Sequence, residues 1–416
     1  MTAREPPAAT PIPLREARAQ LAEANALCSA DGGALWHVSL CGPMMMVDSK
    51  TRFIVANQAD ARGLLRPQDG VFVGTLPADE NIANTAVTWA GVRWVQLVWP
   101  LAADPAARDV TMMHELFHRI ADQVGIVAQG NVDNPQLATA DGRYYLQLEW
   151  RALARALRTT DDAERRRAVG DALAFRGARR AAFPGSAASE DALEMHEGLA
   201  EYTGVVIGRP ADRTAAALHD LSSHVDDPSF VRSFAYATGA PYGLLLDRYA
   251  PAWRRDIART RSLSDTLAAA TGGPASDVEL AAAAYEGPAL QAAEQVRAAE
   301  LAAQLAPYQR RLIDGPVVTL TFRHMKISFN PGNVQPLGTA GSVYPSLRIV
   351  DDWGILQVTG GALVTSDWKA VIVPVPAAAT VRPLTGDGWT LELAPGWRLE
   401  PDARAGDLRL VSPDGG

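Results

Sequence analysis

The stretch Met113-His114-Glu115-Leu116-Phe117-His118 decides how this sequence is interpreted. It lies in a segment that begins at Asp104-Pro105, where an N-cap residue precedes a proline suited to the first helical position. We therefore predict a helix over residues 105–123. Residues four apart share one face of a helix, so the imidazoles of His114 and His118 can bind one metal ion.

Glu115 projects beside the two histidines, where its carboxylate can accept a proton from a water molecule that the metal activates. Two histidines on a helix can also be merely solvated. However, the chain has only seven histidines, and this five-residue pattern is expected by chance in about one such sequence in a hundred. The pattern therefore predicts a zinc site with Glu115 as general base.

A catalytic zinc site needs three protein ligands and an open position, so a third ligand must come from elsewhere in the chain. Glu194, Glu197 and Glu201 stand at helical spacing on one stripe. Gly198, beside this stripe, would allow close approach to the active-site helix. Such a stripe is equally typical of a solvated acidic helix face. Further downstream candidates are His196, His219 and His224.

The pair His114 and His118, followed by Glu197-Gly198-Leu199-Ala200-Glu201-Tyr202, resembles the gluzincin metallopeptidases, which include thermolysin and the aminopeptidase-N-like enzymes. The resemblance implies a zincin-like fold, one Zn²⁺ ion held by His114, His118 and Glu197, and a peptide or protein substrate. It also implies that Glu201 orients a zinc-binding histidine. His196 stands where the family usually has Asn, and the long gap from His118 to Glu197 implies inserted helices over residues 142–183.

A second resemblance involves Tyr236, in the segment Phe234–Gly243. Aminopeptidase-N-like enzymes carry a Tyr-x-x-Gly segment that opens a helix, and Tyr236 matches the tyrosine whose hydroxyl supports the oxyanion. Thr238 replaces the usual Lys. Two packed tyrosines at the start of a helix are the alternative interpretation, and Tyr242 is the reserve candidate. The sequence lacks the Gly-x-Met-Glu-Asn segment that binds a substrate N-terminus, which argues against strict aminopeptidase activity.

Around this centre we expect an α+β architecture in three parts. Residues 1–12 form a flexible tail, residues 13–311 a zincin-like metallopeptidase domain with a largely helical second half, and residues 312–416 an all-β domain, either a sandwich or a barrel. Before the active-site helix, strands are expected over 34–40, 44–47, 52–56 and 71–73. Residues 85–99, which border the cleft, are expected to form either a hairpin or a pair of strands with a bend at Gly91. Helices are expected over 13–27, twice over 142–183 with a break near 159–162, and over 189–206.

The composition excludes several classes of protein. The chain has 416 residues, of which 48% are hydrophobic, and ten Trp, nine Tyr and nine Phe need a core to pack in, so disorder is excluded. Basic residues (39) are fewer than acidic ones (47), so nucleic acid is not expected as a partner. No stretch approaches 18 uninterrupted apolar residues, and no signal peptide is visible before Leu14.

Two questions stay open at the level of sequence. Cys28 and Cys41 could form one bridge in an exported protein or remain reduced thiols in the cytosol. The expected activity is hydrolysis of peptide bonds by a zinc peptidase. The alternative is a catalytically inactive zincin scaffold that binds peptide or glycan, although the intact Glu115 counts against it.

Overall fold

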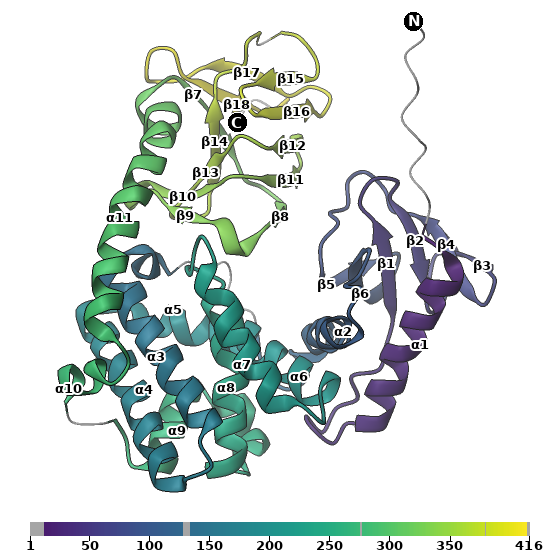
Figure 1. Ribbon diagram of the computed structural model, residues 1–416. Helices are drawn as coiled ribbons and strands as arrows, with labels where there is room; N and C mark the ends of the chain where they lie inside the picture. Colours follow the sequence, from purple (N-terminus) through teal and green to yellow (C-terminus); the bar gives the residue numbers. More distant parts are fainter. Residues whose placement is uncertain (1–11, 128–133, 275–276, 379, 414–416) are drawn as a thin grey trace, which may run out of the picture.

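The computed structural model describes residues 12–127, 134–274, 277–378 and 380–413. The tail expected over residues 1–12 thus lies almost wholly outside the described residues. The described part is mixed α/β, with eleven α-helices and three sheets, none of which closes into a barrel (Figure 1).

The first sheet has six strands in the order β3-β4-β2-β1-β6-β5. Strands β1 and β6 pair in parallel, and the other neighbours pair antiparallel. Strand β5 is last in the order and pairs only with β6, so its outer edge is free of other strands of the described residues. One face packs against helices α1 (Leu14–Asp31) and α2 (Pro105–Ile120), and alternate residues on the other face form a small separate core. The strands are β1 (Met44–Asp48), β2 (Phe53–Ala56), β3 (Arg66–Gln68), β4 (Val71–Thr75), β5 (Thr85–Trp89) and β6 (Val92–Trp99).

The strand expected over residues 34–40 is wrong. This segment forms turns after Gly32 and Gly33, which both have positive φ, and it has no partner strand. Its apolar residues, Leu35, Trp36 and Leu40, are buried in the helical core instead. Cys28 and Cys41 form a disulfide across the segment, linking α1 to the chain just before β1.

The middle of the chain is helical. Helices α3 (Ala140–Arg158) and α4 (Asp162–Ala182) pack against each other, and the break between them falls where it was expected because Asp161 caps α4. The core that begins at α1 continues through these helices as far as α11. The remaining helices are α5 (Ser186–Leu193), α6 (Leu199–Gly208), α7 (Arg213–Ser223), α8 (Phe234–Tyr249), α9 (Leu263–Thr271), α10 (Val278–Ala283) and α11 (Gly287–Gln309).

After α11 the chain forms two open sheets, ordered β17-β18-β7-β14-β13-β10-β9 and β15-β16-β12-β11-β8. Apolar side chains from both sheets share one core, separate from that of the helices. The two sheets form the sandwich alternative, and the barrel alternative is wrong because each sheet ends in two edge strands. The strands are β7 (Val317–Thr321), β8 (Lys326–Phe329), β9 (Gln335–Pro336), β10 (Gly341–Tyr344), β11 (Leu347–Asp351), β12 (Gly354–Val358), β13 (Ala362–Thr365), β14 (Ala370–Pro374), β15 (Leu384–Gly386), β16 (Trp389–Leu393), β17 (Arg398–Pro401) and β18 (Leu408–Val411).

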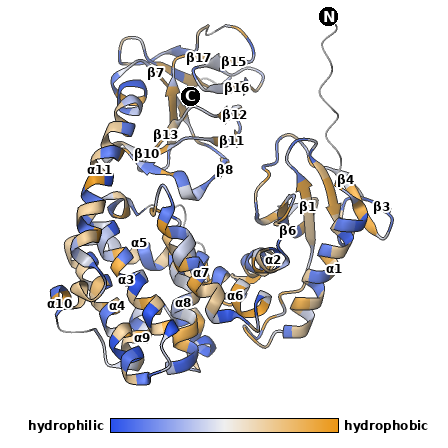
Figure 2. Ribbon diagram, viewed as in Figure 1, coloured by the Kyte–Doolittle hydropathy of each residue, from blue (hydrophilic) through white to orange (hydrophobic). Residues whose placement is uncertain are grey.

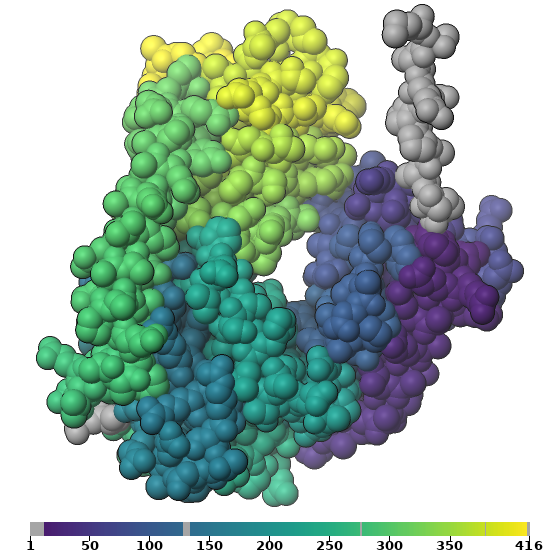
Figure 3. Space-filling model, in the orientation of Figure 1, coloured from purple at the N-terminus to yellow at the C-terminus, as the bar shows by residue number. Residues whose placement is uncertain are grey.

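Hydrophilic and hydrophobic residues alternate along the helices (Figure 2). Within the described residues, no helix combines the length and apolar character that crossing a membrane requires. The space-filling view shows an opening through the molecule, bounded by the first sheet, the helices and the C-terminal sheets (Figure 3).

Candidate metal centre

Helix α2 holds the segment from Met113 to His118 in a fixed position. Its N-cap Asp104 accepts a hydrogen bond from the backbone N–H of Ala107, and Pro105 occupies the first turn. Met112, Met113, Leu116, Phe117 and Ile120 bury the helix in the core. His114 and Glu115 are only 5% and 6% exposed. The motif therefore lies in the interior of the protein rather than on a solvated face.

The helix expected over residues 189–206 is interrupted by a π-helical turn, Glu194–Gly198, between α5 and α6. The wider turn changes the helical register, so Glu194 no longer shares a face with Glu197. Glu194 accepts hydrogen bonds from Arg176 at 2.7 Å and from Thr238 at 2.6 Å. The expected three-carboxylate stripe is thus wrong: Glu197 and Glu201 approach α2, and Glu194 does not.

The sequence predicted that Gly198 would allow close approach to the active-site helix, but other glycines do so. Gly198 faces α8, where a Cβ atom on it would lie 3.0 Å from the Cα of Gly239. Helix α2 is instead approached by Gly204 and Gly208 of α6, where an added Cβ would lie 2.7–2.8 Å from backbone atoms of Val110 and Asp109. A side chain at either position would push α6, and with it Glu201, away from the histidines.

Three potential ligand atoms converge between α2 and the π-helical turn. The Nε2 atoms of His114 and His118 are 3.1 Å apart, and Oε2 of Glu197 lies 3.5 Å and 3.2 Å from them, respectively. In a tetrahedral zinc site with ligands about 2.0–2.1 Å from the metal, adjacent ligand atoms are about 3.3–3.4 Å apart. His114, His118 and Glu197 form a group that could hold a metal ion, and their spacing fits zinc.

Neighbouring side chains orient this group. Glu201 Oε2 lies 2.9 Å from Nδ1 of His114, which leaves Nε2 to face Glu197. The His196 ring stacks on His118 with centroids 4.6 Å apart, and its Nδ1 lies 3.2 Å from Oε1 of Glu197. At this centre, Oε2 of Glu115 and Nδ1 of His118 are buried and have no hydrogen-bond partner among the described residues. The Glu115 oxygen is thus available to a water molecule or a substrate.

The electrostatics of the cluster favour a cation. Burial lowers the pKa of His118 to about 4, so its imidazole is neutral at pH 7 and able to act as a ligand. Burial opposes the ionisation of Glu197, but the electrostatic interaction with the His118 ring and the hydrogen bonds with the surrounding histidines outweigh it and hold the Glu197 pKa well below its usual range. Burial lowers the pKa of His114, but hydrogen bonds with Glu197 and Glu201 outweigh burial and raise it well above the ordinary value.

Glu115 differs from the other carboxylates. Burial raises the pKa of Glu115 to about 7, and the charges of Glu197 and Glu201 act in the same direction while that of His114 opposes them. A carboxyl group with a pKa near neutrality can both accept and release a proton under ordinary conditions.

Of the two tyrosine candidates, Tyr236 lies at the centre and Tyr242 does not. The Tyr236 ring stacks on His114, with centroids 5.5 Å apart and planes within 3°. Burial, the charge of Glu197 and a hydrogen bond to Glu197 raise the Tyr236 pKa well above its usual value, so the phenol keeps its proton and donates toward Glu197. The Tyr242 hydroxyl donates to Oε1 of Glu149 at 3.0 Å in the helical core. The reserve candidate is therefore outside the centre.

The remaining histidine candidates do not join the metal-binding group. His224 contacts Oδ2 of Asp227 at 2.7 Å through its Nδ1 atom, and His219 lies on α7. Asp220, also on α7, was not singled out from the sequence. Burial raises its pKa well above the usual value, and the charge of Glu201 adds to the effect. Its isolated position in the sequence carries no signal of this proximity.

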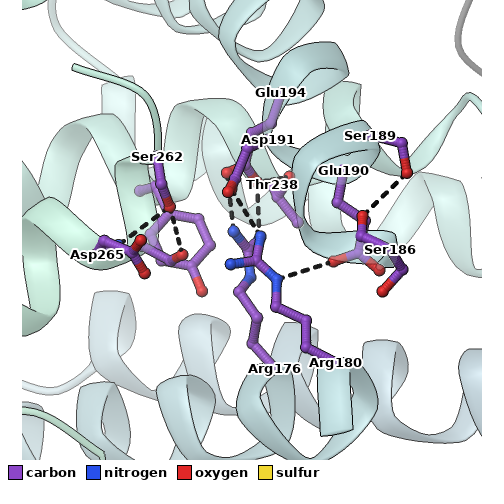
Figure 4. A network of polar contacts seen from close by, with 12 residues as sticks. Arg176, Arg180, Ser186, Ser189, Glu190, Asp191, Glu194, Thr238, Ser262 and Asp265 are labelled. Atoms are coloured by element: carbon purple, nitrogen blue, oxygen red, sulfur yellow. Dashed lines mark hydrogen bonds and ion pairs between the residues drawn. The ribbon is translucent and has the colours of Figure 1, made fainter. Parts of the chain in front are cut away.

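A buried ionic network lies behind the π-helical turn. Arg176 and Arg179 of α4 bind Glu149, Glu190 and Glu194, with N–O distances of 2.7–3.0 Å, and the contacts around Arg176 and Arg180 are drawn in Figure 4. Helix α4 thus supplies the cations that contact the segment carrying Glu197.

The C-terminal sheets also contribute to the centre, which the sequence did not indicate. A cavity of about 130 Å³ is lined by Glu197 and Tyr236 together with Phe329 and Pro331 from the C-terminal sheets, and by Leu193 and Arg232. Phe329 carried no sequence signal because it belongs to an ordinary strand pattern far along the chain.

Comparison with protein-family models, with curated proteins and with solved structures finds no significant match for this chain.

Proposed function

We propose that this protein is a zinc-dependent peptidase of gluzincin type, with a zincin-like catalytic part, that hydrolyses peptide bonds. The observation that carries the proposal is the triangle formed by the two histidine Nε2 atoms and Oε2 of Glu197, with sides of 3.1, 3.2 and 3.5 Å. These sides match the edges of a tetrahedral zinc site. The donor set of two imidazoles and one carboxylate is one that catalytic zinc commonly uses.

The surroundings of the triangle support the same metal. Glu201 would hold the His114 ring with Nε2 toward the ion, as a carboxylate does behind many zinc-binding histidines. His118 is neutral and Glu197 is ionised at pH 7, which are the protonation states that ligands require, whereas His114 would release its proton when the metal binds. A bound zinc ion supplies a Lewis acid and lowers the pKa of water in its open position.

The chain's own residues would then manage the proton. Glu115, with one buried oxygen free of protein partners, accepts a proton from the attacking water and delivers it to the leaving amine. Tyr236 lies against His114 with its phenol protonated, so its hydroxyl can donate to the oxyanion.

The test is the variant Glu115→Gln, which keeps size and polarity but cannot accept the proton. Zinc content should remain near one ion per chain, and the rate of cleavage of an unstructured peptide library should fall about 10²–10⁴-fold. A metal-loaded wild-type protein that cleaves no peptide would contradict the proposal and favour a peptide- or glycan-binding protein on an inactive scaffold.

A further inference from the structure

A second cavity lies between the first sheet and the C-terminal sheets. Its volume is about 300 Å³, and its lining includes the consecutive residues Thr85, Ala86 and Val87 of β5 and the consecutive residues Lys326–Phe329 of β8. Successive side chains of a strand point to opposite faces of its sheet, so a cavity that touches consecutive residues touches the edge of the strand. The cavity is therefore a groove between two strand edges.

No strand of the described residues pairs with either of these two edges. Strand β5 is the last strand of its sheet and pairs only with β6, and β8 is the last strand of its sheet and pairs only with β11. The outer edge of a strand offers backbone N–H and C=O groups at every second residue. The groove thus has two walls, each able to bind the backbone of an extended chain.

The groove meets the candidate metal centre at Phe329. This residue ends β8 and lines both the groove and the smaller cavity that contains Glu197 and Tyr236. Its ring is held from the side by Tyr344, with centroids 4.8 Å apart. An extended chain that leaves the groove past Phe329 would enter the cavity of the metal-binding group.

Polar contacts keep the two walls together. Lys326 Nζ lies 2.9 Å from Oε1 of Glu80, and the Ser328 hydroxyl donates to the carbonyl oxygen of Ile82 at 3.3 Å. Arg348 of β11 donates to the carbonyl oxygen of Glu80 at 3.3 Å. A folded protein domain would not fit through a groove of this size, whereas an extended segment would.

We propose that the C-terminal sheets form one wall of the substrate groove, so that an extended polypeptide segment binds between the edges of β5 and β8 and Phe329 contacts a substrate side chain beside the metal centre. The inference rests on the proposed function for the identity of the bound segment as substrate. It assigns Phe329 as a specificity-determining residue that selects for an apolar side chain, and it makes unstructured polypeptide the substrate class.

The test measures binding separately from cleavage. The zinc-loaded Glu115→Gln protein is used to select the tightest-binding member of a random library of unstructured ten-residue peptides, and the affinity of that fluorescein-labelled peptide is measured by fluorescence polarisation. Adding Phe329→Ala should weaken binding at least about tenfold, which equals about 1.4 kcal/mol. The control is Phe322→Ala, because Phe322 packs half-buried against the same core and lines neither cavity. It should change affinity less than about twofold.

Single N-methylation along the peptide tests the two walls. A chain paired on both edges loses affinity when consecutive residues are methylated in turn, because neighbouring N–H groups point to opposite walls. Loss at alternate residues only would mean that the peptide pairs with a single wall, and it would overturn the two-walled groove. Failure to select any binder, or equal losses for Phe329→Ala and Phe322→Ala, would overturn the groove.

The two proposals fail in different ways. If the peptide binds with these signatures but zinc-loaded wild-type protein does not cleave it, the proposed function is wrong and the groove stands. If wild-type protein cleaves peptides and Phe329→Ala leaves KM unchanged, the groove is wrong and the proposed function stands.

Discussion

Replacing Arg176 with methionine tests whether the buried ionic network holds the segment that carries Glu197. The Arg176 side chain is 3% exposed and binds Glu149 at 2.8 Å and Glu194 at 2.7 Å. In the variant, Glu149 keeps Arg179 and Tyr242 as partners, but Glu194 keeps only the Thr238 hydroxyl. Leaving a buried charge without its ion-pair partner costs about 3–5 kcal/mol of unfolding free energy.

A second substitution should restore part of the lost stability. In the double variant Arg176→Met/Glu194→Gln, the uncompensated charge is removed as well, so at least half of the lost unfolding free energy should return. Urea unfolding followed by tryptophan fluorescence gives the free-energy changes. Hydrogen exchange in peptides that cover residues 186–208 shows whether the loss is located in the segment that includes the π-helical turn.

An exposed ion pair provides the control. Arg166 and Asp162 lie 3.1 Å apart on α4 with both side chains 48% exposed, so Arg166→Met should cost less than about 1 kcal/mol. If Arg176→Met costs no more than Arg166→Met, or if the double variant is less stable than Arg176→Met, the network does not support this segment and the reasoning is refuted.

Two further predictions concern acid stability and metal affinity. Burial opposes ionisation of Glu190, but Arg179 outweighs it and lowers the Glu190 pKa from 4.5 to about 2. The lowered pKa corresponds to about 3 kcal/mol of stability that is present above pH 4.5 and is lost as the pH falls toward 2. Urea unfolding between pH 6 and pH 2.5 measures this loss. If the unfolding free energy of Glu190→Gln fell with pH as steeply as that of the wild type, the prediction would be contradicted. Glu201→Ala removes the carboxylate that orients His114 and should weaken zinc binding about 10–100-fold in a chelator competition assay; unchanged affinity would show that Glu201 is not a positioning residue.

The local features of the active-site helix could be predicted from the sequence because short-range chemistry determines them. Asp104 and Pro105 start α2, and the four-residue spacing places His114 and His118 on one face. The hairpin of β5 and β6 was predictable for the same reason, since Ala90 and Gly91 both adopt the positive φ that its turn requires.

The long-range features could not be predicted in the same way. The first residue of the π-helical turn, Glu194, contacts Arg176, whose partners lie 18 and 27 positions away. The turn separates Glu194 from Glu197, although their spacing in the sequence places them on one face. The contribution of Phe329 to the cavity depends on how the C-terminal sheets return to the first sheet, and no periodicity in β8 encodes that contact.

The most direct test of the account is the zinc stoichiometry of the purified protein and of one ligand variant. Protein prepared without chelators and measured by inductively coupled plasma mass spectrometry should contain about one zinc ion per chain. Glu197→Ala should bind zinc at least about tenfold more weakly, because one of three ligands is gone. Wild-type protein without zinc after incubation with excess zinc and desalting, or a Glu197→Ala variant with wild-type affinity, would contradict the proposed metal centre.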